Sequence, residues 1–73
     1  GGRGVGRALL EAVLDACRAR GVRQVLAVIG DSGNAASIAL HRRCGFTDAG
    51  RLHAVGYKHD RWVDVVLMQK ALP

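Results

Sequence analysis

The stretch that decides the fold is Asn34-Ala35-Ala36-Ser37-Ile38-Ala39-Leu40-His41-Arg42-Arg43-Cys44-Gly45-Phe46. It predicts a helix that begins at an Asn34 or Ser32 cap, because these side chains accept hydrogen bonds from the free N–H groups at a helix start. The helix runs to about Cys44 and ends at Gly45, and the phenylalanine that follows folds back over the last turn in a Schellman-type contact. The sequence therefore predicts this helix together with both of its ends.

The same helix carries an amide, a hydroxyl and an imidazole. His41 follows Asn34 by about two helical turns, so the two side chains lie on nearly the same side, and Ser37 lies between them. All three can face one extended ligand. They also fit a structural interpretation, in which Asn34 is a helix cap, Ser37 is a surface hydroxyl, and the His41 ring is bonded to a backbone carbonyl.

Upstream lies a glycine-rich turn, Arg3-Gly4-Val5-Gly6-Arg7, which runs directly into a helical pattern ended by Gly21. The glycines let the backbone approach a ligand closely, the first helical N–H groups favour an anion such as phosphate, and Arg3 and Arg7 add positive charge. The turn alone equally fits an ordinary flexible N-terminus, and no strand precedes Gly1 as a dinucleotide fingerprint requires. The i, i+3, i+4 spacing predicts one buried stripe, made of Val5, Ala8, Leu9, Ala12, Val13 and Ala16.

Three strands are expected in the rest of the chain. Residues 24–29 form a continuous apolar run rich in β-branched residues, which is typical of a parallel strand covered on both faces. After Gly50 the chain is strand-like through Tyr57, turns at residues 58–60 and returns from Arg61 to Lys70. Asp64 is the one acidic residue in an otherwise apolar stretch of that last strand and needs a partner or water. The order helix, strand, helix and strand pair predicts an α/β fold.

Composition restricts the class of protein. The 73 residues are 49% hydrophobic with one proline, which indicates one small packed domain over residues 1–73, without a membrane span or a signal segment. The net charge of +5 suits nucleic acid, an anionic membrane surface or a small polyanion such as coenzyme A, and the three aromatic residues do not form a stacking platform for nucleic acid. Two cysteines without metal-ligand spacing favour a reducing cytoplasm, and His53 and His59 are too isolated for a metal site.

The glycine turn and the stretch from Asn34 to Phe46 together resemble the acetyl-CoA-dependent N-acetyltransferases of the GNAT superfamily. The tail Gly56-Tyr57-Lys58-His59-Asp60-Arg61-Trp62-Val63-Asp64-Val65-Val66-Leu67-Met68-Gln69 is similar to that of the phosphinothricin and methionine-sulfoximine acetyltransferases. The resemblance covers the C-terminal half of such a domain. It implies transfer of an acetyl group from acetyl-CoA to the primary amine of a small amino-acid-like substrate.

The resemblance also implies roles for individual residues. The amides of Gly4, Val5, Gly6 and Arg7, with Arg3 beside them, hold the coenzyme pyrophosphate, although Gly1 stands where the family has Arg or Gln. Asn34 bonds the pantetheine arm, Ser37 lies next to it, and His41 faces the sulfur and protonates the departing thiolate. An imidazole with an unperturbed pKa near 6.5 is a stronger acid than a thiol near 8.5. The acceptor side of the site is formed by Val55, Gly56, Tyr57 and Lys58.

Two other functions stay open from sequence alone. The family's preceding strand and its carboxylate base would lie upstream of Gly1, so the chain could be a non-catalytic half-domain that binds coenzyme A or a partner chain. The basic surface could instead bind nucleic acid, which steep salt dependence and indifference to coenzyme A would reveal. Trp62 more often packs in a core than touches a substrate. An unpaired sheet edge beside residues 25–29 predicts either self-association as a homo-oligomer or a poorly ordered edge.

Overall fold

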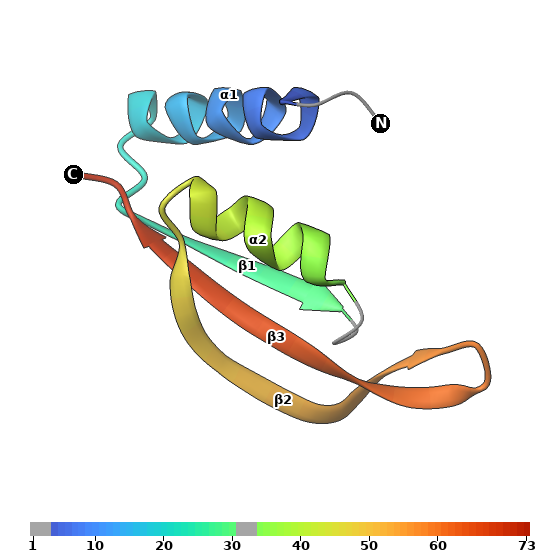
Figure 1. Cartoon of the computed structure of the whole chain (residues 1–73). Coiled ribbons are helices and arrows are strands. Elements are labelled where there is room, and N and C mark those ends of the chain that lie inside the picture. The colour runs from blue at the N-terminus through green and yellow to red at the C-terminus, as the bar shows by residue number, and fades with distance from the viewer. Residues whose placement is uncertain (1–3, 31–33) are drawn as a thin grey trace.

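The computed structural model describes residues 4–30 and 34–73. Within this part of the chain the elements are α1 (Val5–Ala19), β1 (Gln24–Gly30), α2 (Ala35–Arg43), β2 (Thr47–Lys58) and β3 (Arg61–Ala71). The strands form one antiparallel sheet in the order β1-β3-β2, and both helices lie on the same side of it (Figure 1). The predicted α/β order with its final strand pair is confirmed. Gly1, Arg3 and Ser32, which carried predictions, lie outside the described residues.

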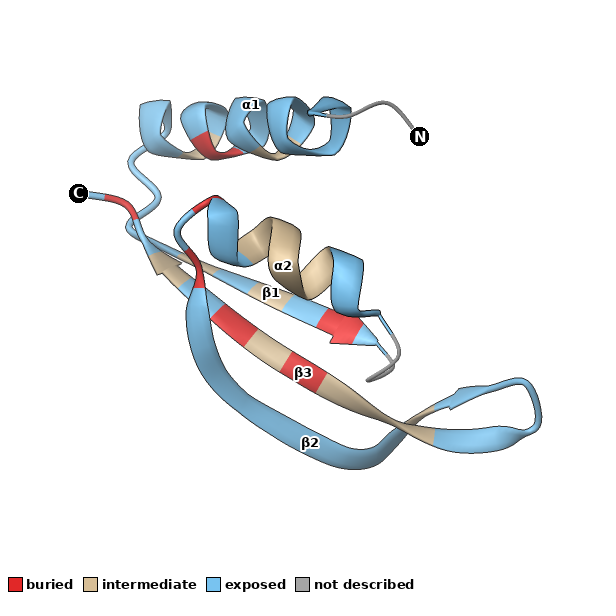
Figure 2. Ribbon diagram, viewed as in Figure 1, coloured by how far each residue is buried: buried red, intermediate tan, exposed pale blue. Residues whose placement is uncertain are grey.

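The core lies between the two helices and the sheet. Figure 2 shows the buried positions in red on α1, β1, β3 and the segment after α2. Burying a side chain the size of leucine or methionine contributes about 1.5–3 kcal/mol each. Seven residues make up this core: Leu14, Ile29, Cys44, Phe46, Val66, Met68 and Leu72.

The prediction for the buried face of α1 was wrong by one helical position. Leu14 is fully buried, and Leu10 and Cys17 pack beside it. Residues of the predicted stripe are exposed instead, among them Leu9 at 65%. Both stripes are apolar and lie side by side on the helix, so the spacing alone could not show which of them faces the sheet.

The prediction of a parallel strand covered on both faces was also wrong. β1 pairs antiparallel with β3, from Gln24 opposite Ala71 to Gly30 opposite Val65. Its side chains alternate, with Ile29 in the core and Val28 64% exposed on the face away from the helices. A continuous apolar run carries no information on strand direction. That direction depends on the β2–β3 hairpin, which places β3 antiparallel to β1.

The predicted helix ends are confirmed. Gly21 and Gly45 both adopt positive φ angles, 80° and 91°, which only glycine adopts without strain. After α2 the Phe46 N–H donates to the His41 carbonyl at 2.9 Å and the Gly45 N–H donates to the Arg42 carbonyl at 3.0 Å, which is the Schellman pattern. The last turn of α2 is thereby tied to the start of β2.

β2 and β3 form a long hairpin that extends past the end of β1 as a two-stranded arm (Figure 1). β2 begins at Thr47, earlier than predicted, because Thr47 already pairs with Gln69. The tight turn has positive φ at His59 and Asp60, as a primed hairpin turn requires. Among the described residues, no helix is long and apolar enough to cross a bilayer.

Candidate functional site

The start of α1 has the features of an anion site. Gly4 is its N-cap, with φ 80° and ψ −8°, and the first intrahelical bond runs from the Ala8 N–H to the Gly4 carbonyl at 2.8 Å. The N–H groups of Val5, Gly6 and Arg7 therefore have no acceptor within the helix. Among the described residues no side chain caps the helix, and its first turn contains no acidic residue. These free donors and the positive end of the helix dipole favour a phosphate.

This first turn packs directly against α2. A Cβ built on Gly6 would lie 3.3 Å from Leu40 Cδ2, whereas one built on Gly4 would meet no atom within 4 Å. Gly6 therefore allows the close approach of two helices as well as of a ligand, a packing role that the sequence did not reveal. Leu40 directly precedes His41, so the glycine turn and the helix of the polar side chains are neighbours. Both helices begin at the right of the view in Figure 1.

Asn34 is the N-cap of α2, as predicted. Its side-chain oxygen accepts a hydrogen bond from the Ser37 N–H at 3.3 Å. The cap uses the oxygen only, so the two N–H groups of the Asn34 amide are free of this role. The structural interpretation and a contact with a ligand are therefore compatible at this residue.

His41 is half-buried and held at two points. Its Nδ1 lies 2.7 Å from the Ser37 carbonyl oxygen, and its ring meets the Phe46 ring edge-to-face with centroids 5.0 Å apart. Because a carbonyl only accepts, Nδ1 must carry the proton and donate. The backbone-bonded ring of the structural interpretation is thus present. It leaves Nε2 as the nitrogen that can exchange a proton with a ligand.

The predicted acceptor-side residues lie together on the hairpin arm. Gly56, Tyr57 and Lys58 pair with β3, while Val55 belongs to an irregular segment just before them. The Tyr57 and Trp62 rings meet edge-to-face at 5.1 Å, and Trp62 is 65% exposed, so the expectation that it packs in the core was wrong. The arm extends beyond the region that the helices cover, which leaves both rings accessible.

Two other groups define the chemistry of the region. Burial raises the pKa of the Cys44 thiol, and a hydrogen bond and the charge of Glu11 raise it further, against the opposing charges of Arg7 and Lys70. A buried neutral thiol is a poor nucleophile. On the arm, Asp64 accepts from the Ala54 N–H at 2.9 Å and lies 3.4 Å from both Arg51 Nη1 and His53 Nδ1. The predicted need of Asp64 for a partner is confirmed.

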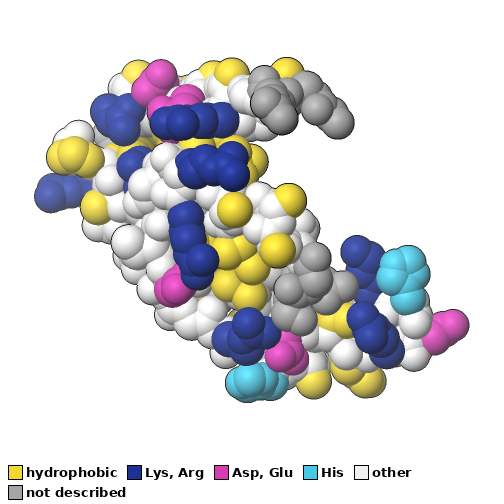
Figure 3. Space-filling view, viewed as in Figure 1, with side chains coloured by type: hydrophobic (Ala, Val, Ile, Leu, Met, Phe, Trp, Pro, Cys, Tyr) yellow, Lys and Arg dark blue, Asp and Glu magenta, His cyan; other side chains and the backbone are white. Residues whose placement is uncertain are grey.

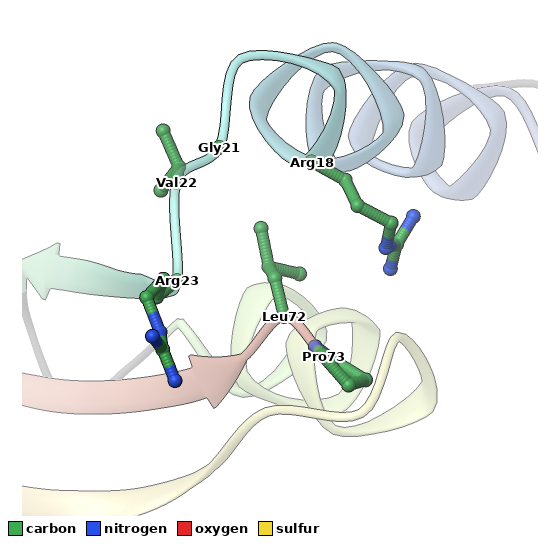
Figure 4. Close-up of a pocket in the computed structure, with 6 residues that line it drawn as sticks. All are labelled: Arg18, Gly21, Val22, Arg23, Leu72 and Pro73. Atoms are coloured by element: carbon green, nitrogen blue, oxygen red, sulfur yellow. The ribbon is translucent and has the colours of Figure 1, made fainter.

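A shallow cavity of about 270 Å³ lies elsewhere. It is lined by Arg18, Gly21, Val22, Arg23, Leu72 and Pro73 (Figure 4). This is the C-terminal end of α1, about 20 Å from the glycine turn at 1.5 Å per residue. Arg18 there is paired with Asp15 at 2.8 Å. The cavity is therefore separate from the candidate site.

The surface charge suits a polyanion. Figure 3 shows Lys and Arg side chains spread over this face, from α1 down to the hairpin arm. Residues 4–30 and 34–73 contain no group of three or more His, Cys, Asp or Glu side chains arranged to hold a metal ion. The site thus offers backbone donors, cations and one imidazole, which fit the phosphates and the thioester of a coenzyme A derivative.

Comparison with known proteins identifies the family. Residues 1–46 match the model of the acetyltransferase (GNAT) family. The chain is 52% identical over 71 residues to phosphinothricin N-acetyltransferase of Alcaligenes faecalis, covering 97% of this chain and 36% of that protein. It is 48% identical over 68 residues to L-methionine sulfoximine/L-methionine sulfone acetyltransferase of Pseudomonas aeruginosa, covering 93% and 39%.

A solved structure agrees. The phosphinothricin acetyltransferase of Sinorhizobium meliloti, in complex with acetyl-CoA, superposes with a TM-score of 0.88 at 48% identity, covering 97% of this chain and 38% of that one. The chain belongs to the GNAT acetyltransferase family, and the predicted resemblance is confirmed. It spans well under half the length of each of these relatives.

Proposed function

We propose that this chain forms the coenzyme-binding portion, residues 1–73, of an N-acetyltransferase domain. It acts in transfer of an acetyl group from acetyl-CoA to the primary amine of a small amino-acid-like substrate such as L-methionine sulfoximine or phosphinothricin. The observation that carries the proposal is the uncapped start of α1 packed, through Gly6 and Leu40, against the helix of Asn34 and His41. The names of the relatives support the substrate class.

Each residue of the site has a separate proposed role. The N–H groups of Val5, Gly6 and Arg7 bind the coenzyme phosphates, and the Asn34 amide and Ser37 bind its pantetheine arm. When bound, acetyl-CoA would supply an acetyl thioester, the acyl donor for the amine. The Nδ1 bond to the Ser37 carbonyl orients the His41 ring, and Nε2 of the charged ring would donate a proton to the thiolate leaving group.

Cys44 takes no part in this chemistry. It is 4% exposed, and its raised pKa keeps the thiol neutral, so an acetyl-cysteine intermediate on this residue is disfavoured. Direct attack of the amine on the thioester needs only a base. By the family resemblance that base lies upstream, and this chain supplies the coenzyme side and the acid.

The test is a pair of measurements. On this chain, calorimetry should show coenzyme A binding that weakens as salt rises, because the contacts are charge-assisted. On an intact enzyme that carries this chain together with the upstream base, an assay of free thiol release with acetyl-CoA and L-methionine sulfoximine should show turnover. Binding without turnover would support the alternative, a half-domain that only binds coenzyme A or a partner chain. Failure to bind coenzyme A in low salt would refute the proposal.

We also propose self-association and a cytoplasmic location. β1 is at one edge of the described sheet, and residues 24–30 contain no charged residue or proline to discourage pairing with another strand. Cys17 and Cys44 are both free thiols, as a reducing compartment favours. Light scattering should give a mass above 7.7 kDa that rises with concentration. A constant monomer mass up to millimolar concentration would contradict self-association.

A further inference from the structure

Asp64 lies where the three-stranded sheet becomes the two-stranded arm. The last pair between β1 and β3 is Gly30 opposite Val65, and Asp64 is the neighbour of Val65 on the side of the arm. Beyond this residue, the pairs of β3 within the described part of the chain are with β2. The direction of the arm beyond it depends on how β2 pairs with β3 at this junction.

The pairing there is irregular. Leu52 pairs with Val65 and Gly56 pairs with Val63, so the three residues from His53 to Val55 stand opposite Asp64 alone. Such bulges bend and twist a strand and redirect its side chains. Ala54, in the middle of the bulge, has a φ of 54°, which an alanine adopts only where its surroundings hold it.

The Asp64 carboxylate is what holds the bulge. One oxygen accepts from the Ala54 N–H at 2.9 Å, and the other lies 3.4 Å from Arg51 Nη1 and from His53 Nδ1. Groups from Arg51, His53 and Ala54 thus converge on one side chain. The pKa of Asp64 is lowered, first by the hydrogen bond from the Ala54 N–H and then, against an opposing effect of desolvation, by the charge of His53 and by hydrogen bonds from Arg51 and His53, which agrees with a carboxylate that stays ionised in this position.

We propose that Asp64 is a positioning residue for the amine substrate. By fixing the Ala54 bulge it sets where Val55 and the segment up to Lys58 lie relative to the end of β1. The inference rests on the proposed function, in which that segment forms the acceptor side. Asp64 itself does not touch the reacting atoms, so its loss should affect amine recognition while leaving the coenzyme end of the molecule unchanged.

The experiment uses the whole chain and three variants. Asp64→Ala removes every contact of the carboxylate. Asp64→Asn keeps an oxygen that can accept from the Ala54 N–H and so should preserve most of the position. Asp48→Ala is the matched control, because Asp48 is a carboxylate on β2, the strand that carries the bulge, and it pairs with Arg42 at 3.1 Å and has no bond to the bulge.

Two affinities are measured for each protein by amide NMR titration. One is for coenzyme A alone, and the other is for L-methionine sulfoximine, the acceptor of the proposed function, added with coenzyme A present. In the wild type, the acceptor should shift the amides of Val55, Gly56 and Tyr57. Asp64→Ala should weaken acceptor binding at least tenfold and leave the coenzyme A affinity within twofold, while Asp64→Asn and Asp48→Ala stay within about threefold of wild type. Loss of protection from exchange at the Ala54 N–H should accompany Asp64→Ala only.

The outcomes separate the two ideas. A wild-type chain that does not bind coenzyme A refutes the proposed function. A chain that binds coenzyme A but whose acceptor leaves the bulge amides unshifted, or whose acceptor affinity is the same in Asp64→Ala, overturns the role of Asp64 alone. Equal weakening by Asp64→Ala and Asp48→Ala would also overturn it, because the effect would then follow any lost carboxylate on this face.

Discussion

Gly6 can be replaced by valine to test whether the start of α1 binds the coenzyme phosphates. The built Cβ at Gly6 already lies 3.3 Å from Leu40 Cδ2, so the two γ-carbons of valine would crowd the contact between the helices. Overpacking of this kind costs about 1–3 kcal/mol, which lowers Tm by roughly 4–8 °C per kcal/mol in a domain of this size. Gly6→Val therefore changes both the packing and the proposed phosphate site.

A double-mutant cycle with Leu40→Ala separates the two effects. In the Leu40→Ala background the valine has room, so Gly6→Val should cost less stability than it does in the wild type. The loss of coenzyme A affinity should be the same in both backgrounds. Blocking one charge-assisted backbone contact removes about 1.5–3 kcal/mol, or roughly a 10- to 150-fold rise in Kd.

Thermal unfolding gives the stability arm of this cycle and calorimetric titration of coenzyme A gives the binding arm. If Leu40→Ala and Gly6→Val/Leu40→Ala bind coenzyme A equally well, the backbone at Gly6 is not part of the phosphate site. If the affinity recovers together with the stability, the glycine acts through packing only. Either result would refute the reasoning from the free N–H groups of α1.

In an intact enzyme that carries this chain, His41→Phe should lower kcat roughly ten- to a hundredfold with coenzyme A affinity nearly intact, whereas Asn34→Ala should weaken coenzyme binding first. Unchanged turnover and an unchanged pH profile in His41→Phe would make the residue structural. The pKa of Asp64 is lower in the folded than in the unfolded protein, so the ionised carboxylate stabilises the fold. This contribution to the unfolding free energy is complete above the unfolded pKa near about 3.9 and is lost as pH falls through the lower folded pKa. The unfolding free energies of wild type and Asp64→Asn should therefore differ at about pH 6 and converge in strong acid. Gly45→Ala should cost about 1–2 kcal/mol through its φ of 91°. Gly30→Ala, where a Cβ meets no atom within 4 Å, should leave the denaturation midpoint unchanged or slightly raised.

The sequence predicted those parts of the site that depend on short-range geometry. The Asn34 cap, the Gly45 end of α2 and the spacing of His41 all follow from hydrogen bonds between residues three to five positions apart. The partner of His41 Nδ1, the Ser37 carbonyl, lies within the same turn and was among the alternatives that the residues allowed. Local rules of helix geometry were sufficient for these features.

Tertiary structure alone decided the rest. α1 carries two neighbouring apolar stripes, and only packing against the sheet selects Leu14 over Leu9 for the core. The direction of β1 depends on β3, which lies about forty residues further along the chain. Gly6 packs against Leu40, and the Asp64 carboxylate accepts a hydrogen bond from the Ala54 N–H. Each of these contacts joins residues on different elements, and sequence periodicity carries no signal for such contacts. The sequence by itself determined where the helices start and stop, because the hydrogen bonds that cap a helix join residues within about one turn. Which face of each helix packs against the sheet depended on the tertiary structure, because several apolar surfaces compete for a single core.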